Sequence, residues 1–147
     1  MKLREYEFSK QIRKDTAFCD FVNDLSRIIN QGLTAVIMTI PLTGQTGDIS
    51  TTTIYTPVAA GLFKINVYMI CTVAGGGTLT CTIGWTDIVG AKTLEPASGV
   101  DLSSTANGAV GTSFISSGAS AITYATAIAV KTGSPQYALY LVLEQLG

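Results

Sequence analysis

Apolar residues recur with two different periods along this chain, and the change falls near residue 32. Over residues 15–30 they follow the i, i+3, i+4, i+7 spacing of one helical face. This pattern predicts an amphipathic helix, with Asp15 or Thr16 as its N-cap and Gly32 at the C′ position. The apolar face of the predicted helix consists of Phe18, Phe21, Val22, Leu25, Ile28 and Ile29.

Beyond Gly32 the period is two, which is typical of strands. Residues 63–73 and 79–85 both alternate between apolar and more polar positions, on either side of Gly75-Gly76-Gly77. We interpret these two runs as a hairpin around a glycine turn, in which Cys71 lies opposite Cys81. Residues 86–108 are expected to form a loop with a short strand at most. Further strands are predicted at 34–42, 49–56, 109–116, 121–130 and 136–146.

Seven or eight short strands separated by turns predict an antiparallel β sandwich, with a jelly-roll-like arrangement. The last strand ends almost at the C-terminus, so we expect it to occupy a central, well-paired position. The chain is therefore expected to be mostly β and to have two parts. Residues 1–31 would form an N-terminal helical segment for attachment or oligomerisation, and residues 32–147 the β-sandwich domain. Within the first part, residues 1–14 could form a second helix or an extended arm.

The distribution of charge supports the same boundary. Residues 1–31 hold eleven of the nineteen charged residues, whereas the rest of the chain holds only eight, and all 15 glycines lie at or after Gly32. Soluble monomers carry about a quarter charged residues. The shortage in the β domain indicates that neighbouring molecules cover much of its surface. The alternative is a monomer with a polar, uncharged surface.

Histidine, which many enzymes and metal sites use, is missing from the chain. With no histidine, the chain lacks the commonest general base and the usual activated nucleophile pairs. It has no Walker-type loop, and Gly75–Gly77 is better explained as a turn than as a phosphate cradle. Its cysteines, Cys19, Cys71 and Cys81, fit neither a disulfide framework nor a zinc site, and are interpreted as small buried side chains. We expect no enzymatic activity, no cofactor and no metal.

Nucleic acid and membrane are not expected partners. The formal net charge of −1 provides no basic field for nucleic acid. The longest apolar-leaning stretch, residues 33–42, is about half the length that a membrane-spanning helix needs. The first ten residues carry both signs of charge and lack the apolar core of a secretory signal, so the chain is expected to fold in a cytoplasm.

Trp85 and Asp87 are candidates for a ligand contact or for the edge of the core. Trp85 continues the face of Leu79, Cys81 and Ile83, which favours the core edge, although an exposed tryptophan could stack on a sugar ring. Asp87 can cap the following turn, or it could bind a ligand or Ca²⁺ weakly. One carboxylate is not a calcium site.

The predicted N-terminal helix has a short apolar face and would be only marginally stable alone in water. It must therefore pack on its own β domain, bundle with the same helix of neighbouring copies, or dock on a partner. The contrast in charge across residue 32 favours the second and third arrangements taken together.

Several ordered motifs extend over about 90 of the 147 residues. They are Tyr55-Thr56-Pro57 with 60–65, the glycine turn with 78–87, the stretch 118–124, and the closing Tyr140-Leu141-Val142-Leu143-Glu144. As a set they resemble small virion structural proteins of tailed bacteriophages. The resemblance implies a jelly-roll-like sandwich, usually a homotrimer, displayed on a phage head or tail as a decoration, cement or short-fibre subunit. It implies no catalytic residues, and the N-terminal helix falls outside it.

The sequence thus predicts a non-enzymatic virion protein that is made in the cytoplasm of a bacterial host. We expect a homotrimeric capsid decoration, cement or short head-fibre subunit that contacts the major capsid protein or another virion protein through its N-terminal segment. One alternative is a glycan-binding module of a tail fibre or adhesin, with a sugar stacked on Trp85 or on exposed tyrosines. A tail or baseplate subunit is the other.

Overall fold

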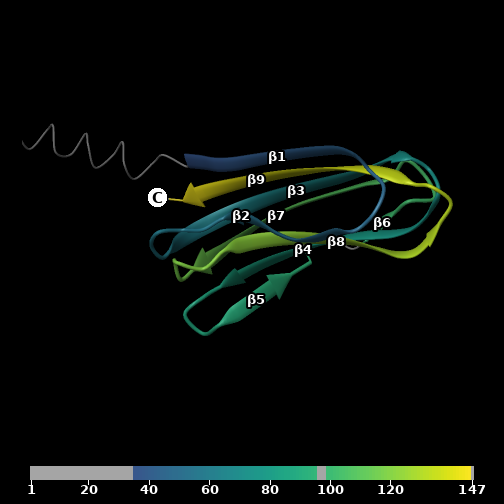
Figure 1. Cartoon of the computed structure of the whole chain (residues 1–147). Coiled ribbons are helices and arrows are strands. Elements are labelled where there is room, and N and C mark those ends of the chain that lie inside the picture. Colours follow the sequence, from purple (N-terminus) through teal and green to yellow (C-terminus); the bar gives the residue numbers. More distant parts are fainter. Residues whose placement is uncertain (1–34, 96–98, 147) are drawn as a thin grey trace, which may run out of the picture. The chain divides into compact units, whose positions relative to one another are not determined.

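A computed structural model describes residues 35–95 and 99–146 of the chain (Figure 1). The predicted helix at 15–30, the arm at 1–14 and the boundary near residue 32 lie outside the described residues.

The described chain forms nine strands in two antiparallel sheets (Figure 1). One sheet has the order β1-β9-β3-β7, and the other has the order β2-β8-β4-β5. The short β6 also pairs with β4, on the edge that β5 occupies further along. The prediction of an antiparallel β sandwich is confirmed. The strands are β1 (Ala35–Gln45), β2 (Ile49–Tyr55), β3 (Gly61–Val73), β4 (Gly76–Thr86), β5 (Ala91–Leu94), β6 (Val100–Asp101), β7 (Asn107–Ser116), β8 (Ile122–Thr132) and β9 (Gln136–Leu146).

The core lies between the sheets because the period of two sends alternate side chains inward. The last strand is central, as predicted, since β9 pairs with β1 on one side and β3 on the other. Most of the buried side chains of this core come from alternate positions of β3 and β9 in one sheet and of β4 and β8 in the other. These side chains are Phe63, Ile65, Val67, Met69, Tyr137, Leu139, Leu141, Leu143, Leu79, Cys81, Ile83, Ile122 and Tyr124.

The predicted hairpin around Gly75–Gly77 is wrong, because β3 and β4 belong to different sheets. Cys71 lies opposite Tyr137 on β9, and Cys81 lies opposite Thr126 on β8. The prediction failed because the same apolar–polar alternation is found in two arrangements. Two consecutive strands can be neighbours in one sheet, or they can face each other across the core from different sheets. The glycines cross between the sheets, and Gly77 has a φ of 117°, a conformation that side chains rarely adopt.

The prediction of at most one short strand in residues 86–108 is also wrong. This segment contains β5 and β6, and β7 already begins at Asn107. Strands of four and two residues have too few positions to show a period, so pattern analysis could not detect them. Their pairing with the long strand β4 is what makes them strands.

A buried polar link joins the two sheets. The Tyr137 hydroxyl on β9 lies 2.7 Å from the Thr126 hydroxyl on β8 and donates to the Gly47 carbonyl at 2.8 Å. Because the tyrosine has one proton, Thr126 must donate to Tyr137, and Thr126 in turn accepts from the Ile49 N–H at 3.0 Å. Burial raises the pKa of Tyr137, which keeps this donor protonated.

Candidate interaction surface

The outer face of the sheet β1-β9-β3-β7 is the most distinctive surface of the described chain. Alternation along β3 and β9 turns one set of side chains away from the core, and the register places them in rows. Tyr68 lies opposite Tyr140, and in the next row Asn66 lies opposite Val142. The edge strand β7 completes these rows with the small residues Ala109 and Gly111.

Two tyrosines form the centre of this face. The rings of Tyr68 and Tyr140 have centroids 6.1 Å apart at an interplanar angle of 41°, and the residues are 36% and 39% exposed. Beside them the small residues of β7 leave an open hollow of about 400 Å³, which Asn66 and Val142 also line. A Cβ at Gly111 would lie 2.5 Å from the Asn66 Oδ1 atom, so any larger residue there would force the Asn66 side chain to move.

The face carries a single pair of opposite charges. Lys64 Nζ lies 3.9 Å from Glu144 Oε2, and the other described residues of β1, β3, β7 and β9 are uncharged. An exposed ion pair of this kind contributes little to stability, at most about 1 kcal/mol. Further apolar side chains, Leu62 and Ile115, lie opposite each other and are exposed. The composition is therefore that of an interface core, poor in charge and rich in aromatic and aliphatic groups.

Trp85 lies on the other sheet, at the edge of the core. Its ring is 4.7 Å from that of Phe114, centroid to centroid, and the residue is partly buried against the core cluster. Phe114 in turn stacks on Phe63, with centroids 6.1 Å apart. Trp85 therefore bridges the two sheets, and much of its ring is already occupied by protein contacts.

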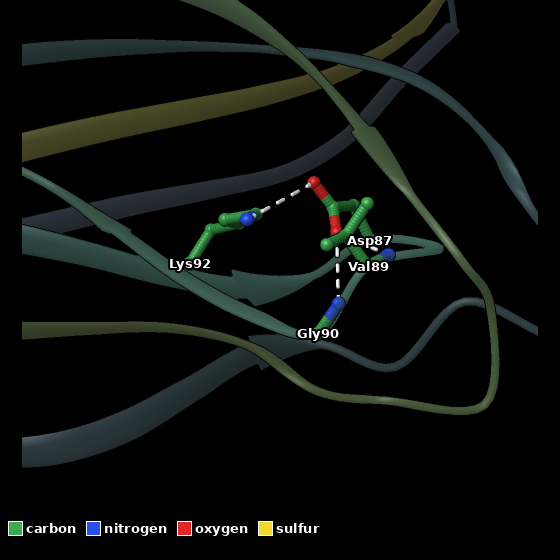
Figure 2. A network of polar contacts seen from close by, with 4 residues as sticks. All are labelled: Asp87, Val89, Gly90 and Lys92. Atoms are coloured by element: carbon green, nitrogen blue, oxygen red, sulfur yellow. Dashed lines mark hydrogen bonds and ion pairs between the residues drawn. The ribbon is translucent and has the colours of Figure 1, made fainter.

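Asp87 organises the turn between β4 and β5, as Figure 2 shows. Its Oδ1 atom accepts hydrogen bonds from the backbone N–H groups of Val89 at 2.7 Å and Gly90 at 3.0 Å, which confirms the predicted turn cap. The Oδ2 atom lies 3.9 Å from Lys92 Nζ. The carboxylate is thus engaged by the turn itself, and the tip presents Ile88, which is 89% exposed.

No cluster in the described residues can hold a metal. Residues 35–95 and 99–146 contain no group of three or more His, Cys, Asp or Glu side chains placed for a metal ion. The cysteines of the core are free and buried, and burial raises the pKa of Cys81 to about 12, so that this thiol stays protonated and unreactive. In the same part of the chain no helix is long and apolar enough to cross a membrane.

The residues of this surface differ from the site residues that the sequence predicted. Trp85 and Asp87 are placed apart from it, on β4 and its turn, and the predicted helix-face residues lie outside the described residues. The pairing of Tyr68 with Tyr140 was not predicted. Both tyrosines alternate with apolar residues in the sequence, which signals an outward position, but only the register of β3 against β9 brings them together.

Comparison with known proteins gives structural matches only. No protein-family model matches the chain, and no curated protein matches it. A chain from the structure of infectious bursal disease virus, Gx strain, is 14% identical with a TM-score of 0.42, over 75% of this chain and 32% of that one. A chain from the acidic stable capsid of Helicobacter pylori bacteriophage KHP30 is 11% identical with a TM-score of 0.43, over 78% of this chain and 92% of that one.

A third match comes from the virus-like particle of the extra small virus of the prawn Macrobrachium rosenbergii. It is 13% identical with a TM-score of 0.26, over 75% of this chain and 81% of that one. This chain spans about a third of the length of the infectious bursal disease virus chain. All three TM-scores lie below 0.5, so the function proposed below rests on the geometry of the chain itself.

Proposed function

We propose that this chain is a non-enzymatic structural subunit of a virus particle, and that neighbouring subunits cover the outer face of the sheet β1-β9-β3-β7. The observation that carries the proposal is the composition of that face. An antiparallel sheet that faces water normally presents polar residues on its solvent side. Here many of those positions are apolar or aromatic: Tyr68, Tyr140, Val142, Leu62 and Ile115. Among the described residues of the four strands, the charges are limited to one ion pair.

The order of the strands supports a jelly roll. When β5 and β6 are counted as one edge strand, eight strands remain, four in each sheet. The chain then passes from one sheet to the other at every connection except the one after β4. Jelly rolls occur in viral capsid domains, lectins and cupins, so the topology limits the function without choosing it. The shortage of charge on the outer face favours a capsid domain, because neighbouring subunits of a particle can cover such a face.

Within the particle, we propose a homotrimeric capsid decoration, cement or short head-fibre subunit, with a tail or baseplate subunit as the alternative. Residues 1–31 would attach it to the major capsid protein or to another virion protein. The supporting observation is the charge partition, since most of the charge of the chain lies in this segment. The β domain would then face its own copies through the outer face of the sheet β1-β9-β3-β7.

Substitution of a charge into the face tests the proposal. We expect the full chain to cosediment with particles of the virus whose genome encodes it, and Tyr140→Glu to weaken this binding at least about tenfold, because an unpaired charge would be buried at the contact. The matched control is Val130→Glu on β8, since Val130 is 86% exposed on the opposite sheet. Equal binding by wild type and Tyr140→Glu, or absence of the chain from purified particles, would contradict the proposal.

A second candidate function is glycan binding at the tyrosine hollow. Tyr68 and Tyr140 offer partly exposed rings, and Asn66 adds an amide with both donors and an acceptor. Trp85 is a weaker candidate because Phe114 already packs on it. On a glycan array, this function predicts selective binding that Tyr68→Ala abolishes and Trp85→Ala retains. If no glycan binds to the folded wild-type protein, this second candidate is wrong.

A further inference from the structure

Each sheet has two edge strands, and these differ in how they are protected. The edges are β1 and β7 in one sheet. In the other sheet they are β2 and the edge that β5 and β6 share, each paired with a different part of β4. An edge strand exposes a row of unpaired backbone N–H and C=O groups. Natural proteins protect such rows from intermolecular pairing with bulges, prolines, charges or short strands.

Three of the four edges show these devices. The strand β1 has two register shifts against β9 and contains Pro41. The strand β2 has two register shifts against β8. The third edge is divided into β5, with four residues and Lys92 among them, and β6, with two residues.

The fourth edge, β7, shows none of them. It pairs with β3 over ten consecutive residues, Asn107–Ser116, without a register shift. It contains no charged residue and no proline. Its outward side chains between the two ends, Ala109, Gly111 and Ser113, are small and uncharged. In the part of the chain that the structure describes, no strand pairs with its other edge.

We propose that β7 pairs antiparallel with β7 of a copy in a second trimer, across a two-fold axis normal to the sheet, so that two four-stranded sheets become one of eight strands. This inference rests on the proposed function and names the neighbour that it requires. The partner is a copy of the same chain because self-pairing of β7 brings no like charges together, and like charges directly opposite would be unfavourable.

The symmetry also has a consequence for the outer face. A two-fold axis normal to the sheet keeps the outward residues of both copies on the same side. The hollows beside Gly111 lie next to the pairing edge in each copy, so the two join into one continuous surface. The paired subunits therefore present both tyrosine pairs to a third partner at once.

Lysines on the edge test this pairing in the full chain. We expect the double variant Ala109→Lys, Ser113→Lys to have half the wild-type mass by light scattering, because natural proteins use edge lysines to prevent strand pairing. The matched control is Thr51→Lys, Thr53→Lys on the bulged edge β2, which should keep the wild-type mass. In hydrogen exchange, the backbone amides of 107–116 that point away from β3 should exchange at least tenfold faster in the β7 variant than in the wild type.

An opposite-charge variant separates pairing from a folding defect. Ala109→Glu, Ser113→Glu should also have half the mass alone, and an equimolar mixture with the lysine variant should return to the wild-type mass, because acidic and basic strands then face each other. A monomeric wild type, an unchanged mass in both variants, or a halved mass without faster exchange at 107–116 would overturn the inference. Cosedimentation with particles is scored separately: a wild type that binds particles but shows no β7 pairing leaves the proposed function intact.

Discussion

Gly118→Ala should lower the free energy of unfolding by about 3 kcal/mol or more, whereas Gly44→Ala should lower it by only about 1 kcal/mol. Both glycines have a positive φ, 77° at Gly118 and 64° at Gly44, so both substitutions introduce left-handed strain. They differ in the space around them. A Cβ at Gly118 would lie 2.6 Å from the carbonyl carbon of Ala59 and 2.7 Å from the nitrogen of Ala60. A Cβ at Gly44 would have no such heavy atom within 4 Å.

Urea denaturation of the two variants measures the difference. The contact at Gly118 is between backbones, which cannot move aside as a flexible side chain can. It holds the β7–β8 loop against the β2–β3 loop, where the Ala119 N–H also donates to the Pro57 carbonyl at 2.7 Å. If both variants lose the same stability, the close approach of these loops is not a constraint on the fold.

Tyr137→Phe should lower the free energy of unfolding by about 2 kcal/mol. It removes one hydroxyl from the buried link, so that the Thr126 hydroxyl loses its acceptor and the Gly47 carbonyl loses its donor. The control is Tyr68→Phe, whose hydroxyl has no protein partner in the described residues and lies on the exposed face. That substitution should change the free energy of unfolding by less than about 0.5 kcal/mol. Equal effects of the two substitutions would show that the link contributes nothing to stability.

A double-mutant cycle with Thr126→Val isolates the bond between the sheets. Thr126→Val alone should also be destabilising, since it deprives Tyr137 of a donor and the Ile49 N–H of an acceptor. Because the two hydroxyls bond to each other, the double variant should be less unstable than the sum of the single ones, by about 1 kcal/mol. Additive effects would mean that each hydroxyl acts separately.

The alternation of apolar residues predicted the long strands well. It located β3 and β9 with their inward sets, such as Phe63 and Ile65 or Leu139 and Leu141. Where a strand had only a few residues, as in β5 and β6, the pattern had nothing to repeat and the prediction of a loop was wrong.

The candidate surface was less predictable than the strands. Asp87 was recognised as a turn residue because an aspartate accepts hydrogen bonds from the residues that follow it in sequence, which is local information. Tyr68 and Tyr140 are distant in sequence, and their contact depends on which strands are neighbours and in which register. The protected and unprotected edges likewise depend on bulges that pairing alone reveals.

The sequence by itself determined that this chain is mostly β, that its charge is concentrated before residue 32, and that it contains no histidine. These are properties of composition and of local period, which need no knowledge of neighbours. Only the tertiary structure decided that the glycine turn joins two sheets, that two tyrosines meet on the outer face of one sheet, and that β7 is the regular open edge. The physical reason is that strand pairing is made by backbone groups common to all residues, so the side-chain pattern indicates which face of a strand is buried but not which strand lies beside it.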